Sequence, residues 1–123
     1  IFIESPKIAG QIDSLWIDTR DDSFVMIDWK RVFPLGASEN SFNQFGFGPC
    51  RTLPHNKYYH YYCQQNLYAK MLSVNYNMHI KRILLVQSHP LALDSTSAVR
   101  EHPVKSDPGL AQSMIEAWQM EPR

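Results

Sequence analysis

Alternation of apolar and polar residues near the beginning of the chain predicts three short strands. Residues 1–4 form the first strand, and a Ser-Pro pair ends it. Residues 8–18 form the second strand, residues 19–22 form a polar turn, and residues 23–32 form the third strand. The second and third strands are therefore expected to pair as a β-hairpin.

The remainder of the chain predicts two helices and a buried strand. Apolar residues at helical spacing predict a helix over residues 57–75, and a second such pattern predicts a helix over residues 109–120. An unbroken apolar run predicts a buried strand over residues 79–88, and residues 91–107 are expected to form a loop. We therefore expect an α/β domain in which two helices flank a mixed, twisted sheet built from the hairpin, the first strand and the 79–88 strand.

The composition limits the size and location of the protein. With 123 residues, 44% of them hydrophobic, the chain is expected to form a single domain around one core, spanning residues 1–123. No apolar run approaches the roughly 20 residues that span a bilayer. No targeting segment is recognisable, so we expect an intracellular protein, in the cytoplasm or nucleus, with no membrane partner. Because the chain opens with Ile1 and not Met, we expect it to be a piece of a longer protein or assembly.

Charge and cysteine content limit the kinds of partner and site. The 12 basic and 12 acidic side chains cancel, which excludes strong attraction of polyanions by overall charge. If nucleic acid binds, a local basic patch or a metal ion must therefore hold it. The two cysteines, Cys50 and Cys63, are too few for a disulfide framework or a zinc site, and we expect two free thiols.

Residues 33–56 are predicted to form a long insertion loop rich in Gly and Pro. Loops of this length in a compact domain are usually functional or mobile. Phe42, Phe45 and Phe47 lie among the glycines. Their rings either stack on nucleic-acid bases or pin the loop to the core, and the sequence leaves both readings open.

The hairpin contains a group of charged residues. Asp28 and Lys30 lie two residues apart on the third strand and so point to the same face. If Asp18 pairs with Ser23 across the turn, the hairpin register brings Asp13 opposite Asp28. The same register matches apolar residues with apolar residues along the remainder of that face.

Two carboxylates in this position favour a metal site. Opposed residues on neighbouring strands have Cβ atoms about 5 Å apart, so the two acids repel each other and raise the pKa of at least one of them. Mg²⁺ or Mn²⁺ removes that repulsion, and Lys30 is placed to stabilise charge on a phosphate. The backbone carbonyl of Trp29 or Ile27 can add a ligand. The alternative is a solvated Asp28–Lys30 pair on the surface of an amphipathic strand.

The segments 9–13, Ala-Gly-Gln-Ile-Asp, and 25–30, Val-Met-Ile-Asp-Trp-Lys, resemble the G-x-x-D and D-x-K motifs of RecB-like nucleases in the PD-(D/E)XK superfamily. Members of this branch also carry Q-x-x-x-Y on the following helix, which Gln64 and Tyr68 match. The resemblance covers about residues 1–90. It implies a restriction-endonuclease-like fold, metal binding by Asp13 and Asp28, and catalysis by Lys30 with orientation by Gln64 and Tyr68.

The family normally has a helix before its first strand, often with a further acid for the metal, and almost nothing precedes Phe2 in this sequence. Either Glu4 replaces that acid, or the helix lies on a missing N-terminal segment. The resemblance implies a Mg²⁺- or Mn²⁺-dependent nuclease that acts on nucleic acid, with DNA favoured over RNA. The alternative is an inactive module of the same fold that binds nucleic acid or a protein partner.

Basic residues outside the hairpin are candidates for contacts with the phosphate backbone. Lys57, Lys70 and His60, all on the predicted 57–75 helix, are the residues we expect to bind nucleic acid. Packing or surface roles are the alternative for His60. His102 is expected to face solvent, within the predicted 91–107 loop.

Overall fold

A computed structural model describes the chain over the following residues: 1–3, 8–31, 45, 48–51, 53, 56–88 and 100–120. Its main sheet has four strands in the order β3 (Ser14–Asp18), β4 (Ser23–Lys30), β5 (Ile80–Gln87) and β6 (Arg100–Val104). The two central strands, β4 and β5, are parallel, and each edge strand is antiparallel to its neighbour. The expected mixed sheet flanked by two helices is therefore confirmed.

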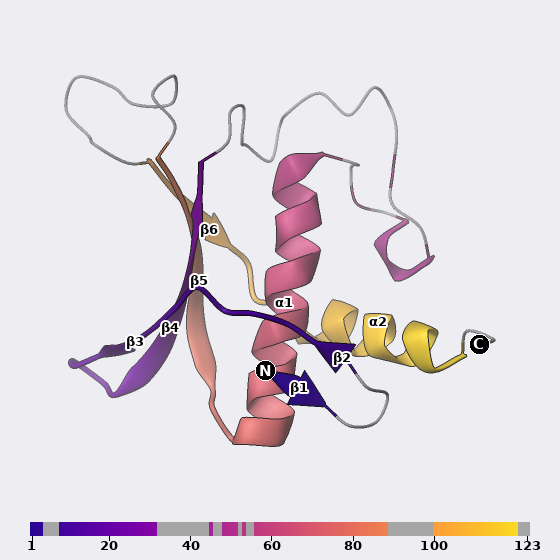
Figure 1. The fold of residues 1–123 in the computed structure, drawn as a ribbon, viewed down its shortest axis with the longest axis horizontal. Coiled ribbons are helices and arrows are strands. Elements are labelled where there is room, and N and C mark those ends of the chain that lie inside the picture. Colours follow the sequence, from indigo (N-terminus) through magenta and orange to yellow (C-terminus); the bar gives the residue numbers. More distant parts are fainter. Residues whose placement is uncertain are drawn as a thin grey trace.

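Helix α1 (Lys57–Tyr76) connects the parallel strands β4 and β5 and lies along one face of the sheet (Figure 1). The Asn56 side chain caps its first turn by accepting the backbone N–H of Tyr59 at 2.9 Å. At the other end Asn77 adopts a left-handed conformation, with φ 53°, and its N–H donates to the Leu72 carbonyl. Both helix ends are thus fixed by asparagines close to the predicted boundaries.

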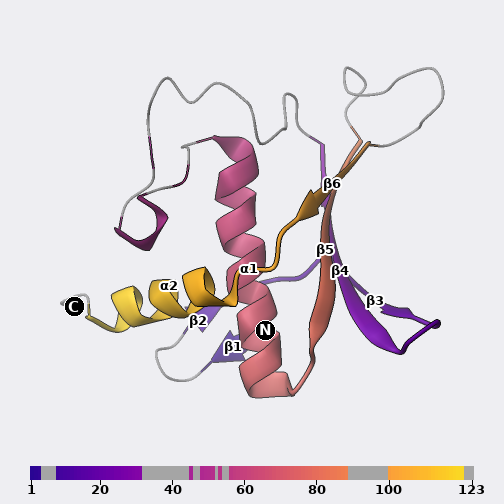
Figure 2. The same cartoon turned by 180° about the vertical axis from the view of Figure 1, so that it is seen from behind.

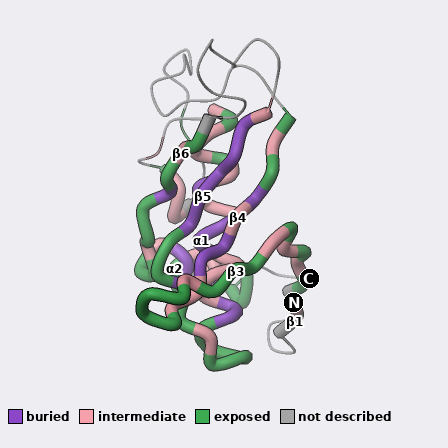
Figure 3. Tube along the Cα trace, turned by 90° about the vertical axis from the view of Figure 1, so that its left-hand side faces the viewer, coloured by how far each residue is buried: buried purple, intermediate pink, exposed green. Residues whose placement is uncertain are grey.

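The main core lies between α1 and the facing side of the sheet. Met26 on β4 and Leu85 on β5 are completely buried there, against Tyr62 and Leu72 of α1. Figure 3 shows the buried stretches running along the two central strands. Parallel strands are normally covered on their faces, and the apolar composition of β4 and β5 fits this position.

Helix α2 (Pro108–Met120) packs across α1 and extends away from the sheet, as both views of the ribbon show (Figures 1 and 2). Asp107 caps it by accepting the Leu110 N–H at 3.1 Å and also accepts the Tyr62 hydroxyl at 2.9 Å. Buried Asn66 accepts the Asp107 N–H at 2.6 Å. These hydrogen bonds hold the beginning of α2 against the middle of α1.

The predicted second strand is interrupted. Instead of one strand over residues 8–18, the chain forms β2 (Ile8–Ala9) and then β3, with residues 10–13 between them. β1 (Phe2–Ile3) pairs with β2 in a separate two-stranded ribbon, so the expectation that the first strand joins the main sheet is wrong. Gly10 closes this ribbon, because it exchanges hydrogen bonds of 2.9 and 2.8 Å with Ile1.

Strand β6 lies within the segment 91–107 that was predicted to be a loop, and that prediction is wrong for residues 100–104. Its sequence, Arg-Glu-His-Pro-Val, gives no apolar alternation and includes Pro103. Proline is tolerated here because β6 is an edge strand, where one side of the ladder is unpaired. The predicted insertion loop 33–56 lies largely outside the described residues, which include the short helix η1 (Gly48–Cys50).

In the part of the chain that the structure describes, no helix combines the length and apolar character needed to cross a bilayer.

Candidate functional site

The hairpin of β3 and β4 has the register that the turn predicted. Asp18 pairs with Ser23 and Leu15 pairs with Met26, so the next position beyond Ser14 and Ile27 brings Asp13 to the level of Asp28. Asp13 lies just before β3, where its Oδ2 accepts the Trp29 N–H at 3.1 Å. The two acids therefore lie on the same side of the sheet and on adjacent segments.

The carboxyl groups of Asp13 and Asp28 are close enough to share a hydrogen bond, and their environments differ. Asp28 is 5% exposed, whereas Asp13 is exposed to solvent. Burial, followed by the contact with Asp13, raises the pKa of Asp28. The hydrogen bond from Asp28, together with the Trp29 N–H, lowers the pKa of Asp13. One proton is therefore held preferentially on Asp28.

Lys30 lies against the buried acid. Its Nζ is 2.7 Å from Asp28 Oδ2 and 4.2 Å from the centre of the Tyr61 ring. Both contacts stabilise a positive charge, one by ion pairing and the other by a cation–π interaction. Tyr61 belongs to α1, so this contact joins the helix to the charged end of β4.

Asp28 Oδ2 is buried but accepts no well-directed hydrogen bond from the described residues. The Lys30 ammonium, 2.7 Å from this oxygen, is nevertheless its ion-pair partner. A cation bound between the two carboxyl groups would offset their mutual repulsion.

The donor set suits Mg²⁺ or Mn²⁺. Mg²⁺ is commonly bound by one or two carboxylates, with water and substrate phosphate oxygens filling the other positions. Among the described residues no group of three His, Cys, Asp or Glu side chains gathers around one point. Glu4, the expected further acid, lies outside the described residues. The backbone N–H of Trp29 donates to Asp13. The backbone carbonyl of Trp29 remains a predicted metal ligand.

The two α1 residues of the Q-x-x-x-Y pattern contact other groups. Gln64 is half-buried, and its Oε1 accepts from Gln65 Nε2 at 3.3 Å. Tyr68 packs on Gly10: a Cβ added to that glycine would lie 2.2 Å from the Tyr68 ring. Tyr68 thus supports the segment that leads to Asp13. The α1 side chain that touches Lys30 is Tyr61, which was not among the site residues predicted from the sequence.

Two further polar residues lie beside the charged group. Gln87 is 1% exposed and is aligned with Lys30 across the β4–β5 ladder. Its Oε1 lies 2.8 Å from His102 Nε2 on β6. His102 is half-buried, so the expectation that it faces solvent is wrong. Its position could not be predicted from the sequence, because β6 itself was not predicted.

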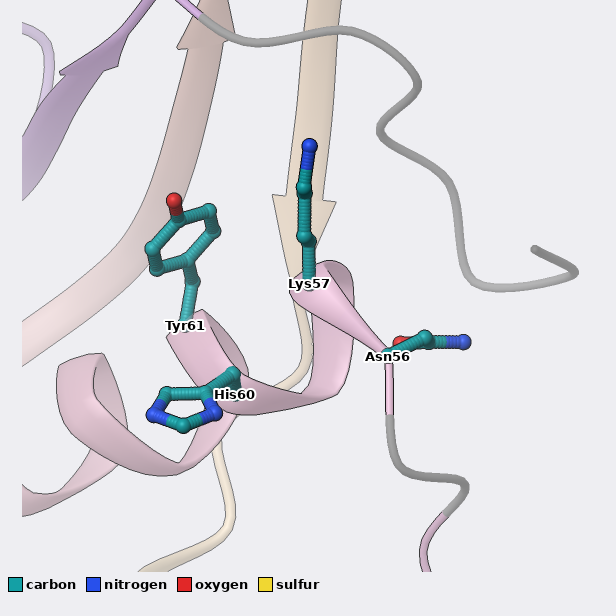
Figure 4. A pocket seen from close by; sticks show the side chains of 4 residues that line it. All are labelled: Asn56, Lys57, His60 and Tyr61. Atoms are coloured by element: carbon teal, nitrogen blue, oxygen red, sulfur yellow. The ribbon is translucent and has the colours of Figure 1, made fainter. Parts of the chain in front are cut away.

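A hollow of about 470 Å³ lies at the beginning of α1 (Figure 4). The hollow is lined by Asn56, Lys57, His60 and Tyr61. Two of these residues, Lys57 and His60, are predicted to bind nucleic acid, and Tyr61 is the residue that contacts Lys30. Lys70 is 13 residues further along the helix than Lys57, which corresponds to about 20 Å of helix. The structure therefore groups Lys57 and His60 but does not bring Lys70 to them.

Comparison with models of known protein families, with curated proteins and with solved structures finds no match for this chain.

Proposed function

We propose that this chain is a Mg²⁺- or Mn²⁺-dependent nuclease of the PD-(D/E)XK superfamily, in its RecB-like branch, with a restriction-endonuclease-like fold. The observation that carries the proposal is the buried carboxyl group of Asp28, which lies beside a second acid and an ammonium group. Buried neighbouring carboxyl groups with shifted pKa values cluster at functional sites, which supports a ligand here. Phosphodiester hydrolysis uses a divalent cation and a nearby ammonium group in this way.

Each residue of the group has a definite role in this proposal. Asp13 and Asp28 would hold the divalent ion, which supplies a Lewis acid for a phosphate oxygen. Water adds to phosphorus, and the ester oxygen leaves with a proton. Lys30, oriented by Asp28 and Tyr61, stabilises the negative charge that develops on the phosphate. Gln64 and Tyr68 keep their proposed orienting role, with Tyr68 acting through its packing on Gly10.

The hollow at the beginning of α1 is the proposed path of the nucleic-acid backbone towards this group. Lys57 and His60 offer cationic or hydrogen-bonding contacts there, and Tyr61 connects the hollow to Lys30. Such a local patch is required because the chain as a whole carries no net charge. We propose DNA as the substrate, in line with the resemblance to RecB-like nucleases.

Cleavage assays test the proposal directly. Linear and circular substrates, single- and double-stranded, are incubated with the protein with and without Mn²⁺. We expect Mn²⁺-dependent cleavage that falls at least about 100-fold in Lys30→Ala, because an ammonium group at the developing charge is lost. Lys81→Ala is the matched control, since Lys81 pairs with Asp21 at the opposite end of the hairpin.

Cleavage by Lys30→Ala at the wild-type rate would overturn the assignment of Lys30. Absence of cleavage by a wild-type protein that still binds Mn²⁺ would favour the alternative, an inactive module of this fold. One observation favours that alternative: within the described residues the site contains two acids and not three. Binding of labelled oligonucleotides without hydrolysis would identify such a module.

A further inference from the structure

Two thiols that are distant in sequence lie next to each other. Cys50 is in η1 and Cys63 is on α1, and they are the two cysteines of the chain. Their sulfur atoms are 3.2 Å apart. A disulfide bond is about 2.05 Å long, so a movement of about 1 Å would bring the two sulfurs to bonding distance.

The segments that carry these thiols are both held in place. η1 packs against α2, and α2 packs against α1. Just after η1, the Leu53 N–H donates to the Cys50 carbonyl at 3.0 Å, and Leu53 packs against the main core. The close approach of the sulfurs therefore follows from the packing of the elements around them and needs no rearrangement of the helix.

We propose that Cys50 and Cys63 form a reversible intrachain disulfide that fastens η1 to α1. The inference is independent of the proposed nuclease function, because it rests on a different part of the molecule. The co-reactant is a small-molecule disulfide such as oxidised glutathione. The two protein thiols give up two electrons and two protons, one sulfur–sulfur bond forms in the protein, and the small disulfide is reduced to two thiols.

The two cysteines have different chemical roles in this thiol–disulfide exchange. Burial, with the contact to Cys50, raises the pKa of Cys63 to about 12, so Cys63 is a neutral thiol at physiological pH. Cys50 therefore attacks the small disulfide first and releases one small thiol. The Cys63 sulfur then displaces the second small thiol as it loses its proton. Because Cys63 must lose its proton, this second step is expected to be slower and to accelerate with rising pH.

The crosslink would close the segment of the sequence that lines the hollow at the beginning of α1 into a loop. Asn56, Lys57, His60 and Tyr61, which line the hollow, all lie between Cys50 and Cys63 in the sequence. Oxidation closes this segment into a loop whose two cysteines are 13 positions apart in the sequence. A loop of that size restricts the unfolded chain considerably, and we expect the melting temperature to rise by roughly 10 °C.

Peptide mapping tests whether the bond forms. The protein is equilibrated with oxidised glutathione, alkylated and digested with trypsin without reduction. Tryptic peptides 32–51 and 58–70 each contain one cysteine and are separated by cleavage after Arg51 and Lys57. We expect them to be recovered joined to each other, in a monomeric protein two hydrogen atoms lighter than the reduced form.

Thermal unfolding tests whether the bond fastens the fold. The oxidised wild type should melt roughly 10 °C above the reduced wild type, while Cys50→Ser and Cys63→Ser should show no dependence on the redox state. The comparison of the two wild-type forms remains valid if either variant folds poorly. Recovery of both peptides unlinked, or linked between two chains, would overturn the proposal. An intrachain link with an unchanged melting temperature would overturn the fastening role.

Discussion

Strands β4 and β5 lie side by side at the centre of the sheet and run in the same direction. The residues that they place opposite each other differ sharply in polarity. Towards α1, β5 presents Leu85, which is completely buried. Its partner in the register on β4 is Asp28, which is almost as deeply buried. Two residues further along each strand, neutral Gln87 is aligned with charged Lys30. At both of these register positions β5 therefore carries an uncharged residue and β4 carries an ionisable one.

The difference shows that the fold does not require charge at this level. Leu85 satisfies the same surroundings by apolar packing, whereas Asp28 must lose its hydration and lie beside another acid. Burial of a charge is unfavourable even when a partner is present, because the ion pair must first be desolvated. This cost supports the proposal that the charged group on β4 binds a ligand.

The largest expected effect is on the apolar strand. Leu85→Ala should lower the free energy of unfolding by about 3 kcal/mol, because it leaves a cavity in the main core. Urea unfolding followed by circular dichroism measures this loss. Cleavage per folded molecule should stay near the wild-type rate at a temperature where the variant is folded. A loss below about 1 kcal/mol would mean that Leu85 is not a core position of the kind described.

A smaller effect of opposite sign is expected on the charged strand. Asp28→Asn should raise the free energy of unfolding by about 1 kcal/mol in metal-free buffer at pH 8, because burial and the contact with Asp13 outweigh the ion pair with Lys30 and disfavour the charged carboxylate. Mn²⁺ at about 100 times its dissociation constant should stabilise the wild type by about 2.7 kcal/mol but leave this variant unchanged. Differential scanning calorimetry with and without Mn²⁺ measures both effects. A destabilised variant that still responds to Mn²⁺ would contradict the comparison.

The smallest expected effect is the pH dependence of that difference. The pKa of Asp28 is raised in the folded protein, so its carboxyl group favours the neutral form there. Its contribution to stability is therefore present at low pH and is lost as the pH rises from the unfolded pKa through the folded pKa. Wild type and Asp28→Asn should be similarly stable in acid without metal and should diverge as the pH rises. Parallel curves from pH 4 to pH 8 would exclude a raised pKa.

The affinity for Mn²⁺ should depend on pH over the same range. The ion and the proton compete for the Asp28 carboxyl group, so the wild type should bind Mn²⁺ more tightly as the pH rises through the raised pKa of that group. Isothermal titration calorimetry in two buffers with different ionisation enthalpies would detect the released proton. Binding that is independent of pH between pH 5 and pH 8 would count against Asp28 as a ligand.

The sequence predicted the parts of the site that depend on local pattern. Four polar residues between two alternating strands determined the hairpin register, and Asp22 adopts a left-handed conformation, with φ 56°, within that turn. This register places Asp13 opposite Asp28. The relevant rule, that side chains two residues apart on a strand share a face, applies without tertiary information.

The remaining features depend on contacts that no local pattern encodes. The contact of Tyr61 with Lys30 requires the packing of α1 on the sheet, and that of His102 with Gln87 requires the unpredicted edge strand β6. The expectation of free thiols for Cys50 and Cys63 gave no indication that their sulfurs would lie together. In each case the partners are separated by more than ten residues, and the chain between them determines where they meet.

The central claim is that Asp13 and Asp28 bind one divalent ion between them, and direct counting of bound Mn²⁺ by electron paramagnetic resonance tests it most simply. The wild type should bind one Mn²⁺ per chain at this site, Asp13→Asn and Asp28→Asn should lose it, and Asp21→Asn, at the turn end of the same hairpin, should keep it. No bound ion in the wild type, or equal binding by all four proteins, would contradict the account.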